Sequence, residues 1–183
     1  MRVHAFLAAP LLLTLAACGG GADDADADGD GTVSAEEVTA AAAKVTPLQP
    51  GQYAMTTELV EIVDPSLSTE EIAQAKAFLG EMGKMAPARC LAEDDARNGM
   101  VGIAQSLQNG DCTIRNLTSD AGGLKAQMTC KNAGKEAEVA LDGVSTGTTS
   151  QMTMTVVEPG AGEGQDKRMV MKIGMNRLGD CPA

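Results

Sequence analysis

The sequence predicts an α+β fold that is mainly an antiparallel β-sheet, a meander of about five to six strands, with one or two short helices and two disulfides. Three observations carry this prediction. From Cys112 onward, apolar and polar residues alternate with a period of two, and short turn sequences separate the alternating runs. Only short stretches have helical spacing. The chain has five cysteines, and the even number that follows Cys18 indicates disulfides in an oxidising compartment.

Residues 1–17 have the form of a lipoprotein signal peptide. Arg2 gives a basic start, and the apolar run over residues 5–15 is too short to span a bilayer as a mature helix. Leu-Ala-Ala-Cys at residues 15–18 resembles the bacterial lipobox, in which the cysteine is lipidated; an ordinary secretory peptide is the alternative. Gly19 resembles the residue that follows the cysteine in lipoproteins sent to the outer membrane. We therefore expect a lipid anchor on Cys18, a Gram-negative outer membrane and a periplasm-facing chain, with no other membrane segment.

The composition excludes several common chemistries from the mature chain. His4 is the only histidine and lies in the leader, so no Ser-His-Asp triad, Cys-His pair or His-ligated zinc site remains. There is no Trp, and Tyr53 and Phe78 are the only aromatic residues after the leader. The net charge of −11 disfavours nucleic acid and anionic lipid head groups as partners. We expect a non-enzymatic protein whose partner is a protein or a small ligand.

Residues 18–46 are predicted to be an acidic tether that contains one EF-hand-like calcium loop and a short helix. Calcium takes roughly six to eight oxygen ligands, which a twelve-residue EF-hand loop supplies from fixed positions. Residues 26–37 match this pattern at every ligand position, and the apolar residue normally found at position 8 is Val33. The glycine of the sharp turn at position 6 is Gly31. The predicted ligands are Asp26, Asp28, Asp30, Thr32 through its carbonyl, Ser34 and Glu37.

The loop has only half of an EF-hand around it. Residues 36–44 are Ala-rich, with acidic residues first and Lys44 last, which favours the exiting helix. Residues 19–25 are poor helix formers, so the entering helix is missing, and the chain has no second loop of this pattern. We expect weak Ca²⁺ binding, with a Kd of roughly 10⁻⁴–10⁻³ M. A solvated acidic spacer is the alternative interpretation.

Residues 47–183 are predicted to form the β domain. Residues 51–65 are rich in β-branched and apolar residues and indicate a strand that Pro65 ends. A helix follows, with Ser68 and Glu71 as a capping box and Gly80 and Gly83 weakening its end. A second short helix is expected over residues 91–97. The later strands are expected over residues 112–119, 124–131, 136–143, 149–158 and 167–178.

The last two of these strands show the alternation most clearly. Their apolar residues fall on one face, where methionine fills a core that lacks aromatic residues; Cu(I) ligation by the thioethers is the alternative. The residues concerned are Met152, Met154 and Val156 in one strand, and Met169, Met171, Ile173 and Met175 in the other.

The spacing of the cysteines favours one disulfide pairing. Cys112 and Cys130 lie equally far from Ala121, the middle of the first predicted turn, so a regular hairpin places them nearly opposite. Cys90 and Cys181 then form a bond that closes a long loop. Pairing of Cys90 with Cys112, and of Cys130 with Cys181, stays open as the alternative.

Several short motifs follow one another along the chain: PGQY at residues 50–53, CLAEDDA at 90–96, GDC at 110–112, MTC at 128–130 and NRLGDC at 176–181. Together they resemble the domain-of-unknown-function family 3617, small secreted proteins of Gram-negative bacteria. The resemblance covers roughly residues 47–183 and departs from the expected pattern at Tyr53, where the family favours Trp. It implies a fold and a compartment but no reaction, and it assigns no catalytic residue.

Two functional hypotheses follow from the sequence. In the first, a lipid-anchored, non-enzymatic periplasmic protein binds calcium weakly through residues 26–37 beside the membrane. In the second, the β domain is a small-ligand or protein-binding module and the acidic loop is only a spacer.

Overall fold

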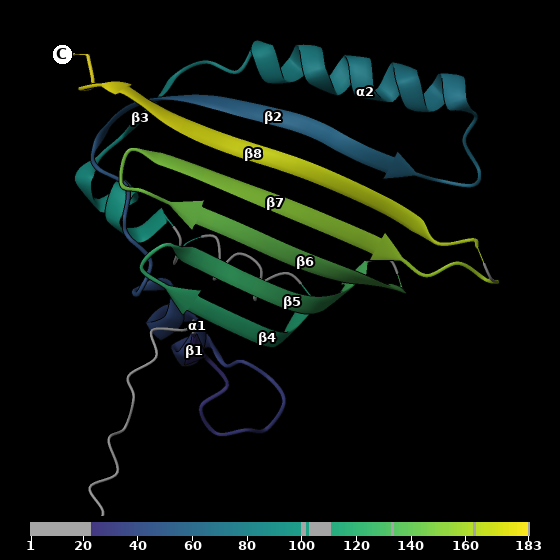
Figure 1. Cartoon of the computed structure of the whole chain (residues 1–183), viewed down its shortest axis with the longest axis horizontal. Helices are drawn as coiled ribbons and strands as arrows, with labels where there is room; N and C mark the ends of the chain where they lie inside the picture. The colour runs from purple at the N-terminus through teal and green to yellow at the C-terminus, as the bar shows by residue number, and fades with distance from the viewer. Residues whose placement is uncertain (1–22, 100–101, 103–110, 133, 163, 183) are drawn as a thin grey trace, which may run out of the picture.

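The computed structural model describes residues 23–99, 102, 111–132, 134–162 and 164–182. These residues form one eight-stranded sheet in the order β1-β4-β5-β6-β7-β8-β2-β3, in which every neighbouring pair is antiparallel (Figure 1). The predicted signal peptide and Cys18 lie outside the described residues. The elements are β1 (Asp23–Asp24), α1 (Ala35–Ala42), β2 (Gly51–Val63), α2 (Thr69–Lys84), β3 (Arg89–Leu91), β4 (Cys112–Asp120), β5 (Gly123–Asn132), β6 (Lys135–Ser145), β7 (Thr149–Glu158) and β8 (Lys167–Gly179), and residues 93–99 are also helical.

The strands β4 to β8 form the meander that the sequence predicts, and the predicted fold class is confirmed. Each strand pairs with the next one along the chain, because short turns join them. At the β4–β5 turn the Asp120 carboxylate accepts the backbone N–H groups of Gly122 (2.7 Å) and Gly123 (3.1 Å). At the β6–β7 turn Gly147 has a φ of 86°, a conformation that L-residues with a side chain rarely adopt.

The long strand β2 places the beginning of the domain beside its end. β2 pairs with β8 along its whole length, and the short β3 pairs with the first residues of β2. The disulfide Cys90–Cys181 joins β3 to the second residue after β8 and links positions 91 residues apart. The second disulfide, Cys112–Cys130, joins directly opposed residues of β4 and β5. The pairing favoured from the cysteine spacing is therefore confirmed.

One face of the sheet carries the apolar core. The register places Met154 opposite Met171 and Val156 opposite Met169, so the methionine-rich faces of β7 and β8 coincide as predicted. Toward β4 the core becomes fully buried. Its buried members there are Val33, Val38, Ala41, Ile114, Leu117, Ala126, Met128, Val139 and Leu141.

A β-bulge in β4 changes which of its side chains point into this core. Ile114 pairs with Met128 and Asn116 pairs with Gln127, so Arg115 is an extra residue in β4. In a regular strand two residues three positions apart face opposite sides of the sheet. The bulge shifts the alternation by one residue, and Ile114 and Leu117 are therefore both buried, at 4% and 3% exposure.

The helix α2 lies along the outer side of β2 (Figure 1). It begins with the predicted capping box, in which Ser68 and Glu71 exchange hydrogen bonds. The helix continues through Gly80 and Gly83 to Lys84. A Cβ atom on Gly83 would lie 2.5 Å from the carbonyl oxygen of Thr57, so this glycine allows the helix to approach the strand. Lys76 Nζ also donates to the carbonyl of Val60 at 3.3 Å.

Within the described ranges, no helix combines the length and the apolar character that crossing a bilayer requires.

Tyr53 is the central residue of a second, smaller core. Its side chain is completely buried and packs with Leu91 and Ala96. Its hydroxyl donates to the carbonyl of Gln49 at 2.8 Å and lies 3.3 Å from that of Gly147. The tyrosine therefore connects β2 to the β6–β7 turn.

Removal of this hydroxyl should destabilise the fold. We expect Tyr53→Phe to lower the free energy of unfolding by roughly 1–2 kcal/mol, because buried carbonyl groups lose their donor. Urea unfolding followed by circular dichroism measures this change. Phe78→Leu is the matched control, since Phe78 is 65% exposed, and it should change the stability by less than about 0.5 kcal/mol. Equal stability of the Tyr53→Phe variant and the wild type would contradict this assignment.

Candidate metal centre

Residues 23–46, here called the arm, lie against the outer edge of β4. Asp23 and Asp24 pair with Ser119 and Thr118 as the short strand β1. The N–H of Ala25 donates to the carbonyl of Leu117 at 2.7 Å. The arm therefore enters the predicted loop from a strand pairing, in the place where an EF-hand has its entering helix.

The three aspartates at loop positions 1, 3 and 5 converge on one point. One carboxylate oxygen from each of Asp26, Asp28 and Asp30 lies within 4.8 Å of the others. Carboxylate oxygens are the ligands that hard divalent cations such as Ca²⁺ prefer. The residues present thus fit a calcium ion in their chemistry, and three negative charges at this separation repel one another unless a cation is bound.

The backbone of the loop is turned by its two glycines. Gly29 and Gly31 have φ values of 71° and 83°. Their N–H groups donate to the two carboxylate oxygens of Asp26, at 2.8 Å from Gly29 and 3.0 Å from Gly31. Asp26 thus organises the turn while it faces the other aspartates. The glycine predicted for the sharp turn occupies the backbone conformation that requires it.

Glu37 closes the loop from its far end. Its Oε2 accepts the N–H of Ser34 at 2.8 Å, and the Ser34 hydroxyl accepts the N–H of Glu37 at 3.4 Å, so the two residues form the capping box of α1. Its Oε1 accepts the N–H of Ala27, the second residue of the loop, at 2.8 Å. One carboxylate therefore connects both ends of the loop across 10 positions of the chain.

These hydrogen bonds keep Glu37 ionised. The N–H of Ser34, followed by that of Ala27, lowers the pKa of the Glu37 carboxyl below its ordinary value of 4.5. The carboxylate is therefore charged at neutral pH, as a metal ligand at position 12 must be.

The arm supplies part of the main core. Val33, at loop position 8, is 6% exposed, and Val38 of α1 is 1% exposed. Both belong to the cluster that includes Ile114 and Leu117 of β4. The N–H of Val33 also donates to the carbonyl of Ile114 at 3.0 Å. In an EF-hand pair the residue at this position packs between two loops, and here β4 takes the place of the second loop.

The predicted ligands divide into two groups in the structure. Asp26, Asp28 and Asp30 come together, whereas Glu37 is held by backbone groups and by Ser34, outside the group of three. Thr32 donates through its hydroxyl to Asp30 at 2.7 Å. The assignment of all six residues as calcium ligands stays a prediction, and the structure shows only that the three aspartates are close together. The sequence did not predict that Ile114 and Leu117 of β4 hold the loop. The one indication was the aliphatic Val33, which needs an apolar partner in a chain that has no second loop of this pattern.

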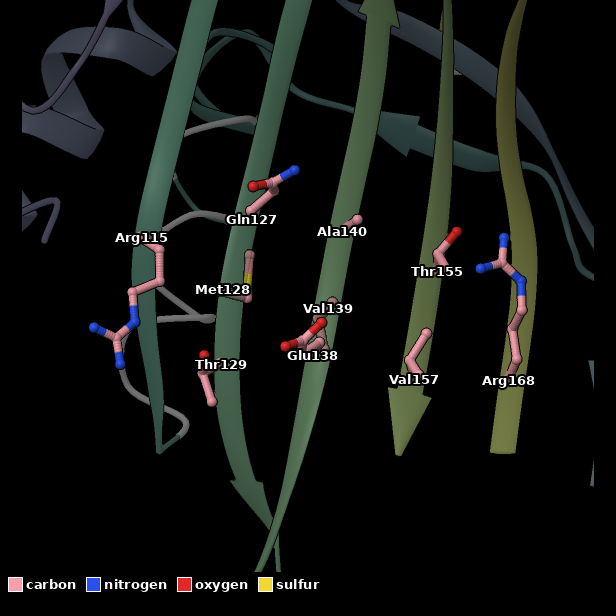
Figure 2. A pocket seen from close by; sticks show the side chains of 10 residues that line it. All are labelled: Arg115, Gln127, Met128, Thr129, Glu138, Val139, Ala140, Thr155, Val157 and Arg168. Carbon is pink, nitrogen blue, oxygen red and sulfur yellow. The ribbon is translucent and has the colours of Figure 1, made fainter. Parts of the chain in front are cut away.

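A second candidate site is a polar groove on the sheet face opposite the core, with a volume of about 340 Å³. Figure 2 shows Arg115 on β4 and Arg168 on β8 at its two ends, with Ala140 of β6 between them. β2 also has a bulge, between Leu59 and Glu61. One row of paired residues across the sheet joins the two bulged strands, β4 and β2; its members are Asn116, Gln127, Ala140, Thr155, Val170 and Glu61. Arg168 forms an ion pair with Glu61 at 3.2 Å, and this carboxylate weakens the attraction of Arg168 for an anionic ligand.

A family model described as "Protein of unknown function (DUF3617)" matches residues 48–181. The match covers the strands from β2 to β8 together with α2 and both disulfides, and it begins after the arm. It agrees with the range in which the sequence motifs resemble this family. No curated protein and no solved structure matches the chain.

If the arm is part of the folded core, truncation of Val38 should destabilise the whole domain. We expect Val38→Ala to lower the free energy of unfolding by roughly 1–3 kcal/mol, because it leaves a cavity between α1 and β4. Thr39→Ala is the control on the exposed side of the same helix. Chemical unfolding monitored by circular dichroism compares the two variants. A Val38→Ala protein as stable as the Thr39→Ala protein would show that the arm packs independently of the sheet.

The low pKa of Glu37 predicts a pH dependence of the arm's stability. A carboxyl whose folded pKa is depressed stabilises the folded state above its unfolded value, and this contribution is lost as the pH falls through the folded value. The contacts of Glu37 should therefore stabilise the arm fully above about pH 4.5 and disappear at lower pH. Carboxyl ¹³C NMR measures the titration directly. Ser34→Ala should move the Glu37 midpoint upward, and an unchanged midpoint would contradict the assigned contacts.

Proposed function

The chain belongs to the DUF3617 family of proteins of unknown function, and on this premise we propose that it is a non-enzymatic calcium-binding lipoprotein with one half EF-hand. The observation that carries the proposal is the convergence of Asp26, Asp28 and Asp30 in a loop whose positions 6, 8 and 12 also match. Acidic composition alone does not explain the buried Val33 or the Glu37 contact to Ala27.

The proposed ion has a structural role. It offsets two of the three negative charges of the aspartates and joins the beginning of the arm to its α1 helix. Since the same loop donates from Val33 to Ile114, calcium stabilises the attachment of the arm to β4. We propose a weak site, with a Kd of roughly 10⁻⁴–10⁻³ M, in keeping with extracellular calcium modules.

The proposed location follows from the leader. The lipobox-like residues 15–18 support a lipid on Cys18 and a periplasm-facing chain at the outer membrane. Only residues 19–22 then separate the anchor from β1. The calcium loop would therefore lie beside the membrane, where it sets how the β domain stands relative to the anchor.

A specific observation also favours the second hypothesis, a ligand-binding β domain. Among the described residues, the side chains of Arg115 and Glu138 make no hydrogen bond or ion pair, although both line the groove of Figure 2. A small ligand that carries both an anionic and a cationic group would complement them. In this hypothesis the acidic loop is a spacer, and substitutions at its carboxylates leave ligand binding unchanged.

Calcium titration of the soluble protein tests the first proposal. We expect millimolar Ca²⁺ to shift the amide NMR signals of residues 26–37, and Glu37→Gln to abolish this response because the site loses its position-12 carboxylate. Glu36→Gln is the matched control, since it removes the same charge one position earlier at a residue that is not a predicted ligand.

Substitutions are preferable to deletion of residues 26–37, because that deletion also removes the buried Val33. No response of the wild type at millimolar Ca²⁺, or an equal response in the Glu37→Gln and Glu36→Gln proteins, would rule out the proposed site.

A further inference from the structure

The arm contacts β4 at the point where the strand is irregular. Two N–H groups of the arm, those of Val33 and Ala25, donate to the carbonyls of Ile114 and Leu117, on either side of the bulge at Arg115. The arm is also attached beyond the bulge, through the β1 pairing and through the N–H of Thr46, which donates to the carbonyl of Ala121 at 3.1 Å. The buried side chains of Ile114 and Leu117 belong to the core cluster that also contains Val33 and Val38. Any shift of β4 at the bulge therefore moves both the hydrogen-bond acceptors and the apolar surface on which the arm rests.

The segment of β4 before the bulge is held by few backbone pairs. Cys112, Thr113 and Ile114 pair with Cys130, Thr129 and Met128 of β5 before the register is interrupted. On the side of this segment that faces away from β5, the N–H of Val33 donates a hydrogen bond to the carbonyl of Ile114. The disulfide Cys112–Cys130 lies two residues from Ile114 and joins the first of these pairs covalently. Both cysteines also pack against the core cluster that contains Val33 and Val38.

We propose that the Cys112–Cys130 disulfide is the positioning element of the arm: it fixes the segment of β4 before the bulge, and opening it loosens the arm and weakens calcium binding. The calcium part of this inference rests on the proposed function, whereas the arm part does not. Because coupling is reciprocal, bound calcium should also make this disulfide harder to reduce.

The chemical step is a thiol–disulfide exchange with a small dithiol such as dithiothreitol. One thiolate of the dithiol attacks a sulfur of the Cys112–Cys130 bond and forms a mixed disulfide, and its second thiolate then displaces the protein sulfur. The protein disulfide gains two electrons and two protons and becomes two thiols. The dithiol loses the same electrons and protons and becomes a cyclic disulfide. Both cysteines are half-buried, so folded protein should react slowly.

The chain offers a matched control in its second disulfide. The double variant Cys112→Ser/Cys130→Ser removes the proposed positioning bond, and Cys90→Ser/Cys181→Ser removes the bond at the opposite edge of the sheet. Two readouts apply to each variant. Amide hydrogen exchange at Ala25 and Val33 reports the arm, and a calcium titration followed at Gly31 reports the loop. Protection of the β7 and β8 amides, such as that of Met154, shows that the sheet is intact.

In the Cys112→Ser/Cys130→Ser protein we expect exchange at Ala25 and Val33 to accelerate by at least about fivefold, and calcium affinity to fall by a similar factor. In the Cys90→Ser/Cys181→Ser protein both quantities should stay within about twofold of the wild type. Equal effects in the two variants, or an unchanged arm in the first, would overturn the proposal.

Loss of the β7 and β8 protection in the first variant would also overturn it, because the bond would then hold the whole sheet. Cys112→Val/Cys130→Val, which keeps apolar side chains at both positions, separates loss of the bond from loss of packing. A wild type that binds no calcium would end the proposed function, while the exchange measurements would still decide the role of the disulfide.

Discussion

The structure depends on how the backbone N–H and C=O groups along the outer edge of β4 find hydrogen-bond partners. An edge strand exposes unpaired N–H and C=O groups that favour pairing with other chains unless something covers them. Here the arm covers that edge with the β1 pairing to Ser119 and Thr118 and with two backbone hydrogen bonds, from Ala25 to Leu117 and from Val33 to Ile114. The bulge at Arg115 directs the side chains of Ile114 and Leu117 into the core, so the same two residues accept hydrogen bonds and bury apolar surface. The acidic loop is held in place by the sheet rather than by a second loop.

The opposite edge of the sheet is managed by different means. The short β3 covers the beginning of β2, and the Cys90–Cys181 bond holds β3 in place. The helix α2 lies along the remainder of β2, where Lys76 donates to a carbonyl of the strand.

Between these edges, other side chains fill the core, because the chain has almost no aromatic residues. Methionines fill the face of β7 and β8, and the single buried tyrosine joins β2 to a distant turn. Each disulfide thus lies near an edge, where backbone pairing is weakest.

Much of this arrangement could be predicted because its causes are local. The capping box Ser68–Glu71, the hairpins after Cys112 and the disulfide of opposed cysteines all follow from residues close in sequence. The calcium-loop pattern, including Gly31, is likewise local. The bulge at Arg115, the two-residue β1 and the docking of Val33 on Ile114 could not be predicted, because each depends on which strand lies beside the arm. Gly83 illustrates the same limit, since it lowers helix propensity but is required where α2 approaches Thr57.

The central claim is that the proposed calcium loop, residues 26–37, and the edge of β4 form one unit. Its most direct test is to follow the β4 amide signals of Ile114 and Leu117 in ¹H–¹⁵N NMR spectra while calcium is added, together with that of Gly31 in the loop. The account predicts that all three signals shift with the same midpoint. Shifts confined to residues 26–37, with the β4 signals unchanged at saturation, would contradict it.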